Sequence, residues 1–118
     1  MKLTAKLAAV PVGMALTLRL TSTTDYLVLD FAPSTGGTYR LRRNSGGGFT
    51  TLHTSSKVGA ADDVIEMTLV GTLLTLVVNG ETIWDDVTIP AMTGTRYGFI
   101  TYSTTQGTRW RSLRGDLP

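Results

Sequence analysis

The chain has 118 residues and a mass of 12.7 kDa, a length that fits one domain with a single hydrophobic core. Its formal net charge is only +2 and its basic residues are dispersed, which argues against a nucleic-acid-binding surface. There is no cysteine, so disulfide bonds, a thiolate nucleophile and cysteine-ligated zinc are excluded.

The N-terminal segment up to Ala15 contains two lysines, but Thr4, Lys6 and Pro11 interrupt any continuous apolar core. We therefore expect no secretion signal in this chain. No apolar run approaches the roughly 20 residues that span a bilayer, so we also expect no membrane insertion.

Short segments in which apolar and polar residues alternate follow one another along the chain. This period of two is typical of β-strands, and it predicts strands at 2–9, 14–20, 26–31, 38–43, 49–53, 64–70, 73–78, 81–86, 97–103 and 108–113. A helix competes in the first segment, because Ala, Leu and Lys favour helices. Turns are expected at 21–25, at 33–37 and in the glycine-rich stretch 44–48, and a long connection at 55–63.

The clearest pattern runs from Val64 to Asp86, where three strand segments are joined by tight turns at 71–72 and 79–80. Asn-Gly at the second turn readily takes the positive φ angles of a type I′ hairpin. One register places the large apolar residues on a single core face, and a slip of one residue would turn them all away from it. The resulting pairs are Val70 with Leu73, Leu69 with Leu74, Met67 with Leu76, Ile65 with Val78, Val78 with Glu81, and Leu76 with Ile83. In this register Trp84 points away from the core.

The same alternation assigns faces to the earlier strands. Leu16, Leu18 and Leu20 are expected to face the core together, with Arg19 on the opposite side. In the next two strands the inward residues are Leu27, Leu29, Phe31, Tyr39 and Leu41, and the outward residues are Tyr26, Val28, Asp30, Arg40 and Arg42.

About ten short strands with turn signals at regular spacing predict an all-β fold, an antiparallel two-sheet β-sandwich or jelly roll. No stretch of the chain has the composition of a linker between domains. We therefore expect residues 1–118 to form a single β-sandwich domain.

The order of these features resembles the concanavalin A-like, laminin-G-like jelly rolls. The resemblance extends from Gly13 to Leu113 and is carried by GMALTLRLTSTTDYLVLDF, GTYRLRR, DDVIEMTLVGTLLTLVVNGETIWDD and GTRYGFITY. Similar domains occur in carbohydrate-binding modules, glycosidases, adhesion proteins and bacteriophage tails. The resemblance therefore implies a place on a virion or an extracellular surface. Members of the superfamily usually carry another strand or two before the segment that starts at Gly13, so this chain resembles a trimmed domain of a larger protein.

Catalytic residues are not apparent. Glycosidases of this superfamily place two carboxylates on one strand as acid and nucleophile. Glu66 is the one glutamate in the middle of a predicted strand, and its same-face neighbours are Val64 and Thr68. His53 is the only histidine, and no Ser and Asp stand at a spacing that suggests a triad. We expect no enzymatic activity.

Calcium is the one cofactor that the resemblance suggests, because lectins and laminin-G domains often bind it on loops. The candidate ligands are Asp62, Asp63, Asp85 and Asp86. Calcium requires six to eight oxygen ligands, so two loop carboxylates would not suffice alone. The alternative is that these side chains accept hydrogen bonds from nearby backbone N–H groups in turns.

Sugar binding requires an aromatic ring for stacking and planar hydrogen-bonding groups around it. The candidate ligand-binding residues, most of them on predicted outward faces, are Trp84, Tyr26, Arg19, Arg40, Arg42 and Tyr102. The alternative for the charged residues is a cross-strand ion pair between Asp30 and Arg40.

The sequence leads to two functional hypotheses. The first is a non-catalytic recognition or attachment module of a phage tail or adhesion protein, which binds a glycan or a cell-surface polysaccharide. The second is a structural module that contacts its own copies or other tail subunits without a small ligand. Exposure of Trp84 distinguishes the two, because stacking on a sugar needs an accessible indole.

Overall fold

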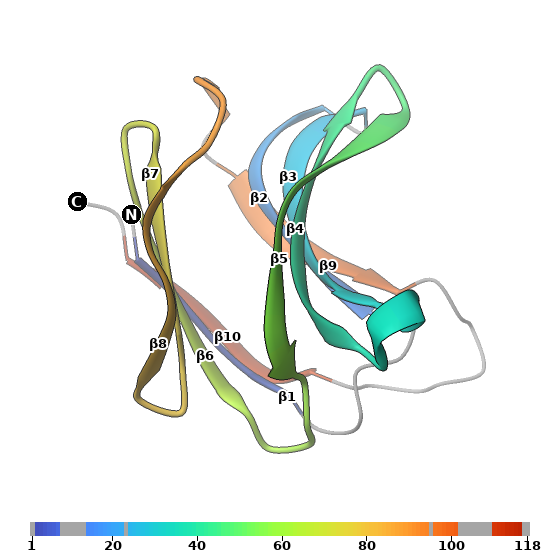
Figure 1. Cartoon of the computed structure of the whole chain (residues 1–118). Helices are drawn as coiled ribbons and strands as arrows, with labels where there is room; N and C mark the ends of the chain where they lie inside the picture. Colours follow the sequence, from blue (N-terminus) through green and yellow to red (C-terminus); the bar gives the residue numbers. More distant parts are fainter. Residues whose placement is uncertain (1, 8–13, 23, 95, 102–109, 117–118) are drawn as a thin grey trace. The chain divides into compact units, whose positions relative to one another are not determined.

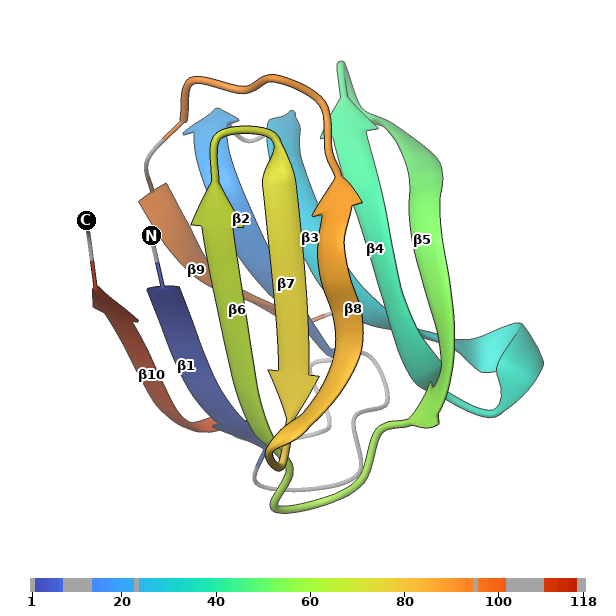
Figure 2. The same ribbon diagram turned by 60° about the vertical axis from the view of Figure 1, so that its left-hand side comes forward.

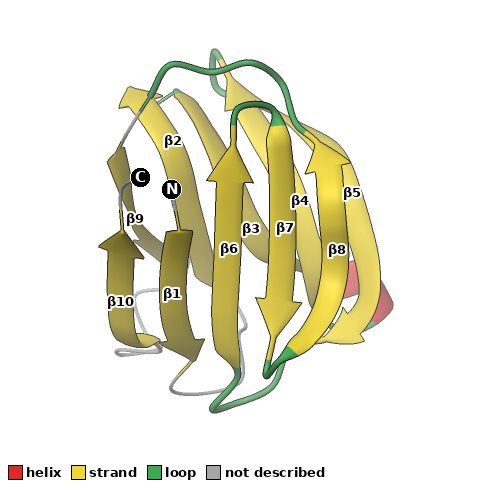
Figure 3. Cartoon of the chain, turned by 90° about the vertical axis from the view of Figure 1, so that its left-hand side faces the viewer, coloured by secondary structure: helices red, strands yellow, loops and turns green. Residues whose placement is uncertain are grey.

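The computed structural model describes residues 2–7, 14–22, 24–94, 96–101 and 110–116 (Figure 1). Strands account for nearly all of the regular structure in these ranges, and the one helical element is a 3₁₀ turn, η1, at Pro33–Thr35 (Figure 3). The strands are β1 Lys2–Leu7, β2 Met14–Ser22, β3 Asp25–Ala32, β4 Thr38–Ser45, β5 Gly48–Val58, β6 Val64–Val70, β7 Leu73–Val78, β8 Glu81–Thr88, β9 Arg96–Thr101 and β10 Trp110–Asp116. The described part of the chain contains no helix that could cross a membrane.

The strands form two antiparallel sheets of five strands each, which confirms the predicted all-β, two-sheet β-sandwich class. The first, the meander sheet, has the order β10-β1-β6-β7-β8, and the second, the arginine sheet, has the order β5-β4-β3-β2-β9 (Figure 2). Each sheet belongs to its own compact unit. Neither sheet is a continuous stretch of sequence, because β1 and β10 join β6, β7 and β8, and β9 joins β2.

The meander sheet follows the register expected for its first hairpin. Val70 pairs with Leu73, and the alternating partners up to Ile65 and Val78 are those predicted. Burial alternates along β6 and β7 because every second side chain faces the core. Asn79 and Gly80 have φ angles of 51° and 81°, as a type I′ turn requires.

The expected register fails in β8. Val78 pairs with Glu81 and Val77 with Thr82, but Leu76 then pairs with Trp84. Ile83 is thus the extra residue of a β-bulge, and the inserted residue turns the next side chain to the opposite face. The prediction that Trp84 points away from the core is therefore wrong, and its side chain is 8% exposed.

A second irregularity of β8 lies at Asp86, where the pairing shifts again between Leu74 and Leu76. Asp86 has a φ of 48°, in the left-handed region that aspartate tolerates better than most residues. Its backbone N–H donates to the Thr75 hydroxyl at 3.1 Å, and the same hydroxyl donates to the Asp86 carboxylate at 3.3 Å.

The arginine sheet is built on the pair β3 and β4, which align without interruption from Asp25 opposite Ser45 to Ala32 opposite Thr38. One face carries the predicted inward residues, with the rings of Phe31 and Tyr39 4.9 Å apart. The opposite face is also largely covered, because every residue of β3 after Asp25 is buried. The residues of β3 that the alternation assigns to the outward face are therefore buried as well.

A bulge in β2 places one of the side chains that bury this second face of β3. Leu18 pairs with Leu27, but the next pair is Ser22 with Asp25, and Arg19 between them has a φ of 51°. Leu20 consequently packs against Tyr26 and Val28. The prediction that Leu20 shares the face of Leu16 and Leu18 is wrong, because a residue in the left-handed region interrupts the alternation.

The backbone of this bulge is in close contact with the segment before β9. A Cβ atom added to Gly94 would lie 2.2 Å from the carbonyl oxygen of Arg19 and 2.7 Å from the carbonyl carbon of Leu20. The Arg19 side chain donates from Nη1 to the carbonyl oxygen of Met92 at 3.1 Å. Arg19 and Gly94 therefore hold the bulge and this segment together.

β5 is longer than the sequence pattern indicated. It continues to Val58, so the predicted connection over 55–63 is wrong for its first four residues. The hydroxyl of Ser55 accepts a hydrogen bond from the Lys57 N–H at 3.2 Å, and the pairing with β4 shifts between Thr38 and Arg40. The strand thus contains an irregular section in which polar residues do not alternate with apolar ones.

Candidate functional site

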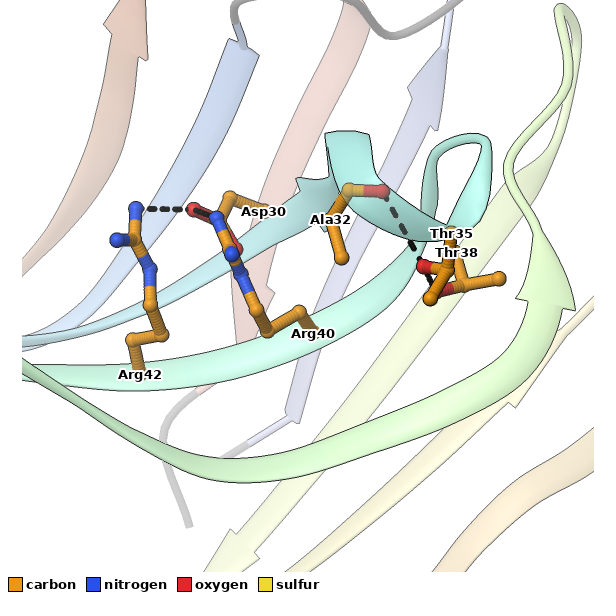
Figure 4. Close-up of polar contacts among 6 residues, drawn as sticks. All are labelled: Asp30, Ala32, Thr35, Thr38, Arg40 and Arg42. Atoms are coloured by element: carbon orange, nitrogen blue, oxygen red, sulfur yellow. Dashed lines mark hydrogen bonds and ion pairs between the residues drawn. The ribbon is translucent and has the colours of Figure 1, made fainter.

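The most prominent polar cluster of the arginine sheet is centred on Asp30. Arg40 donates from Nε to Oδ1 of this carboxylate and from Nη2 to Oδ2, each at 2.9 Å (Figure 4). Arg42 donates from its own Nη2 to Oδ2 of the same carboxylate. The three residues lie side by side because Asp30 pairs with Arg40 and Val28 pairs with Arg42 on neighbouring strands. The predicted cross-strand ion pair is confirmed, and a second arginine joins it.

Burial differs strongly within the cluster. The Asp30 side chain is 3% exposed, whereas those of Arg40 and Arg42 are each 19% exposed. Two arginines against one aspartate leave one net positive charge. The carboxylate therefore holds the two guanidinium groups in place, and the arginines are the part of the cluster that reaches solvent.

An aromatic pair borders the cluster. The guanidinium carbon of Arg42 lies 4.5 Å from the centre of the Phe49 ring, a cation–π contact. Phe49 in turn meets Tyr26 edge to face at 6.3 Å between ring centres. Phe49 is 42% exposed, whereas Tyr26 is 6% exposed. Asp30, Arg40, Arg42, Tyr26 and Phe49 together form what we call the arginine–aromatic face.

Sequence reasoning missed Phe49, although the pairing of β4 and β5 contains the necessary signal. Phe49 pairs with Asn44, and Asn44 lies on the same face as Arg42 because the two are separated by one residue. A register drawn across the turn between Ser45 and Gly48 would have placed Phe49 beside Arg42. The alternation of residue types alone predicts a loop at 44–48 followed by an ordinary strand at 49–53.

The predicted site residues do not all meet on this face. Arg40, Arg42 and Tyr26 do, although Tyr26 is buried and meets the Phe49 ring edge to face. Arg19 bonds to Met92 at the β2 bulge. Trp84 lies on β8 of the meander sheet with its side chain buried. Tyr102 lies outside the described residues.

Of the candidate calcium ligands, Asp63 shows the alternative turn chemistry, in which a carboxylate accepts a nearby backbone N–H. The Asp63 carboxylate accepts from the Ala60 N–H through Oδ2 and from the Asn79 side-chain amide through Oδ1, both at 2.9 Å. Asp86 bonds to Thr75, and Asp62 is an exposed residue with a φ of 68°. Asp85, on β8, is also exposed. Within the described ranges, no three His, Cys, Asp or Glu side chains gather in a way that could hold a metal ion.

Glu66, the single mid-strand glutamate, lies 3.6 Å from the ammonium group of Lys2 on the neighbouring strand β1. Both side chains are about half exposed, so this is an ordinary surface ion pair. The carboxylate of Asp30 is occupied by three N–H donors. Neither acid resembles one of the paired carboxylates that glycoside hydrolysis uses.

Comparisons of the chain with protein-family models, with curated proteins and with solved structures give no match. The chemistry of the arginine–aromatic face therefore has to be judged from its own geometry. Planar, oriented N–H donors beside a partly exposed ring can bind a ligand that offers both acceptor oxygens and an apolar face.

Proposed function

We propose that the chain is a non-catalytic recognition module that binds a glycan on the arginine–aromatic face. The observation that carries the proposal is the pair of largely buried arginines, each 19% exposed, that Asp30 fixes beside the exposed ring of Phe49. Sugars present hydroxyl oxygens at their rims and patches of C–H groups on their ring faces, which match guanidinium donors and an aromatic ring. Preorganised donors lose little conformational entropy when a ligand binds.

The residues proposed to contact the ligand are Arg40, Arg42 and Phe49, with Tyr26 supporting the Phe49 ring. This set replaces Trp84 as the stacking residue, because the indole is buried in the meander sheet. Tyr102 and Arg19 have no assigned role in this proposal. Glu66 is paired with Lys2, and Asp30 is paired with Arg40 and Arg42. Glycoside hydrolysis uses two neighbouring carboxylates, so these pairings favour a binding function over hydrolysis.

The resemblance to jelly-roll domains extends the proposal to context. We propose a jelly-roll connection of the strands and a place on a virion tail or an extracellular surface, where such a module attaches a larger protein to a cell-surface polysaccharide. This extension rests on the resemblance alone.

A glycan array probed with the purified chain tests the proposal, together with a saccharide-hydrolysis assay on the glycans that are bound. We expect retention of a subset of glycans, loss of that retention in Phe49→Ala, and no turnover. Val64→Ala is the matched control, because Val64 is an exposed apolar residue of β6 in the meander sheet. A folded protein that retains no glycan, or one that hydrolyses a glycan it binds, would contradict the proposal.

A second candidate function is a structural module that contacts other subunits or its own copies. The observation in its favour is a pair of exposed apolar residues at one end of the hairpin of β6 and β7, where Val70 is 67% exposed and pairs with Leu73, which is 39% exposed. Solvent-exposed apolar pairs of this kind are covered when subunits associate.

Measurement of molecular mass by light scattering over a range of protein concentrations tests this second function. A stable oligomer that dissociates in Val70→Asp supports it. A monomer at all concentrations that nevertheless binds glycans leaves the recognition function as the better account.

A further inference from the structure

We propose that the arginine–aromatic face selects glycans that carry a negative charge, as a carboxylate or a sulfate ester, and that Arg42 contacts this charge. The inference rests on the proposed glycan-binding function and names the class of ligand. Arg40, besides its proposed contact with the glycan, holds Asp30 in place.

The two arginines bond to Asp30 in different ways. Arg40 uses Nε and Nη2 for both carboxylate oxygens, so the side of its guanidinium that suits a carboxylate is occupied by Asp30. Arg42 gives the carboxylate a single N–H group from Nη2. The Nη1 group of Arg42 is thus not used by the protein's own acid.

Arg42 also has a buried donor that lacks a partner. Its Nε is buried and has no hydrogen-bond acceptor among the residues that the structure describes. A buried donor without an acceptor costs free energy, so such groups usually have a partner in protein, water or ligand. The hydrogen-bonding capacity of this guanidinium therefore exceeds what Asp30 supplies.

Charge points to the same class of ligand. Asp30 compensates one of the two arginines, and the remaining positive charge lies on side chains that are 19% exposed. A neutral sugar would displace water from this charge without compensating it, whereas a carboxylate or sulfate does both. Asp30 itself is too deeply buried to repel an anion by direct contact.

Phe49 lies against the guanidinium group of Arg42. The ring lies under the guanidinium carbon at 4.5 Å and is itself held by the edge contact with Tyr26. This contact restricts the positions that the guanidinium can take. The anionic group and the neighbouring apolar sugar surface would thus meet Arg42 and Phe49 together.

The test is an array of matched pairs, each acidic glycan beside its neutral methyl ester or desulfated form, probed with wild type, Arg42→Gln, Arg42→Lys and Lys2→Gln. We expect wild type to prefer the acidic member by roughly tenfold or more, the ratio expected for one charge-assisted hydrogen bond. Arg42→Gln should remove this preference, and Arg42→Lys should keep only part of it because lysine has no planar fork. Lys2→Gln removes the same charge from the meander sheet and should leave the preference unchanged.

The outcomes separate the inference from the function on which it rests. Equal binding of acidic and neutral members overturns the inference and leaves glycan recognition in place, whereas binding of no glycan by folded protein overturns both. Binding of a single-stranded oligonucleotide as tightly as the best acidic glycan would show a general response to anions and also overturn the inference. If Arg42→Gln does not fold, the test uses Arg42→Lys and the dependence of wild-type binding on added salt. Only the acidic glycans should lose affinity as the salt concentration rises, because salt screens charge–charge attraction. Equal salt dependence of acidic and neutral glycans would overturn the inference.

Discussion

Asp30 is the residue on which the arginine–aromatic face depends. Asp30→Ala removes a carboxylate that accepts three charge-assisted hydrogen bonds and leaves Arg40 and Arg42 without their shared partner. We expect a loss of about 3 kcal/mol in the free energy of unfolding, at the low end for a broken buried ion pair because both arginines reach solvent. Urea denaturation measures this change.

The matched control for Asp30 is Glu66→Gln. Glu66 is also a cross-strand partner of a basic residue, but both members of that pair are about half exposed and 3.6 Å apart. The expected change is at most about 0.5 kcal/mol. Comparable losses in the two variants would show that Asp30 does not organise the arginines.

Gly94 is the residue at which even a methyl group is excluded. In Gly94→Ala the new Cβ would lie 2.2 Å from the backbone oxygen of Arg19, and backbone cannot move aside as a flexible side chain can. We expect a loss of about 3 kcal/mol or more, seen as a lower midpoint of thermal unfolding.

Gly48→Ala provides the comparison for Gly94. The Cβ at this position would meet only the carbonyl oxygen of Ser45, at the ordinary contact distance of 3.7 Å. Its unfolding midpoint should stay close to that of wild type. A mild effect at Gly94 would mean that the segment before β9 does not lie against the β2 bulge as described.

The turn between β7 and β8 is joined to the connection before β6 by a small hydrogen-bond network. Asn79 donates from Nδ2 to Asp63 at 2.9 Å and accepts the Val64 N–H through Oδ1 at 2.8 Å. Asp63 also accepts from the Ala60 N–H. Two elements that are 16 residues apart in sequence are thus held in one arrangement.

Asn79→Gly should destabilise the protein by about 1–2 kcal/mol, because glycine keeps the positive φ but removes both side-chain hydrogen bonds. Asp63→Ala should cost more, since Ala60 also loses its acceptor. A double-mutant cycle of the two should give a coupling free energy of about 1 kcal/mol. Strictly additive effects would show that the Asn79 to Asp63 bond contributes nothing.

The elements also show how far sequence patterns reach. The pairing of β6 with β7 followed from two turn dipeptides and one apolar alternation, because each fixes the same register. The bulges at Ile83 and Arg19 could not be predicted, because neither residue has a preference for the required backbone geometry. Each bulge reverses the next side chain, which is why Trp84 and Leu20 face opposite to expectation. The exposed Phe49 was predictable from register, but its contact with Arg42 depends on side-chain packing that alternation does not contain.

For the whole molecule, the chain order couples the two sheets during folding. The meander sheet needs β1 and β10 beside β6, and the chain between β1 and β6 forms most of the arginine sheet. Neither sheet can therefore be completed from one contiguous segment. Such non-local pairing is typical of chains that fold cooperatively and slowly, in milliseconds to seconds.

We accordingly expect a single unfolding transition. Trp84 is buried on β8, so its fluorescence reports the meander sheet, whereas far-ultraviolet circular dichroism reports all strands. The two signals should give the same midpoint in urea. Separate midpoints would show that the two compact units unfold independently.

The irregular backbone of β8 affects whether copies of the chain can join edge to edge through their sheets. β8 borders the meander sheet on one side, and its two register shifts and the exposed carboxylates of Asp85 and Asp86 interrupt the row of backbone groups that another strand would need. A regular, uncharged border would act as a template for fibres at high concentration. The same insertion that buries Trp84 thus makes this border a poor template, and copies crowded together would associate there through side chains and not by extending the sheet.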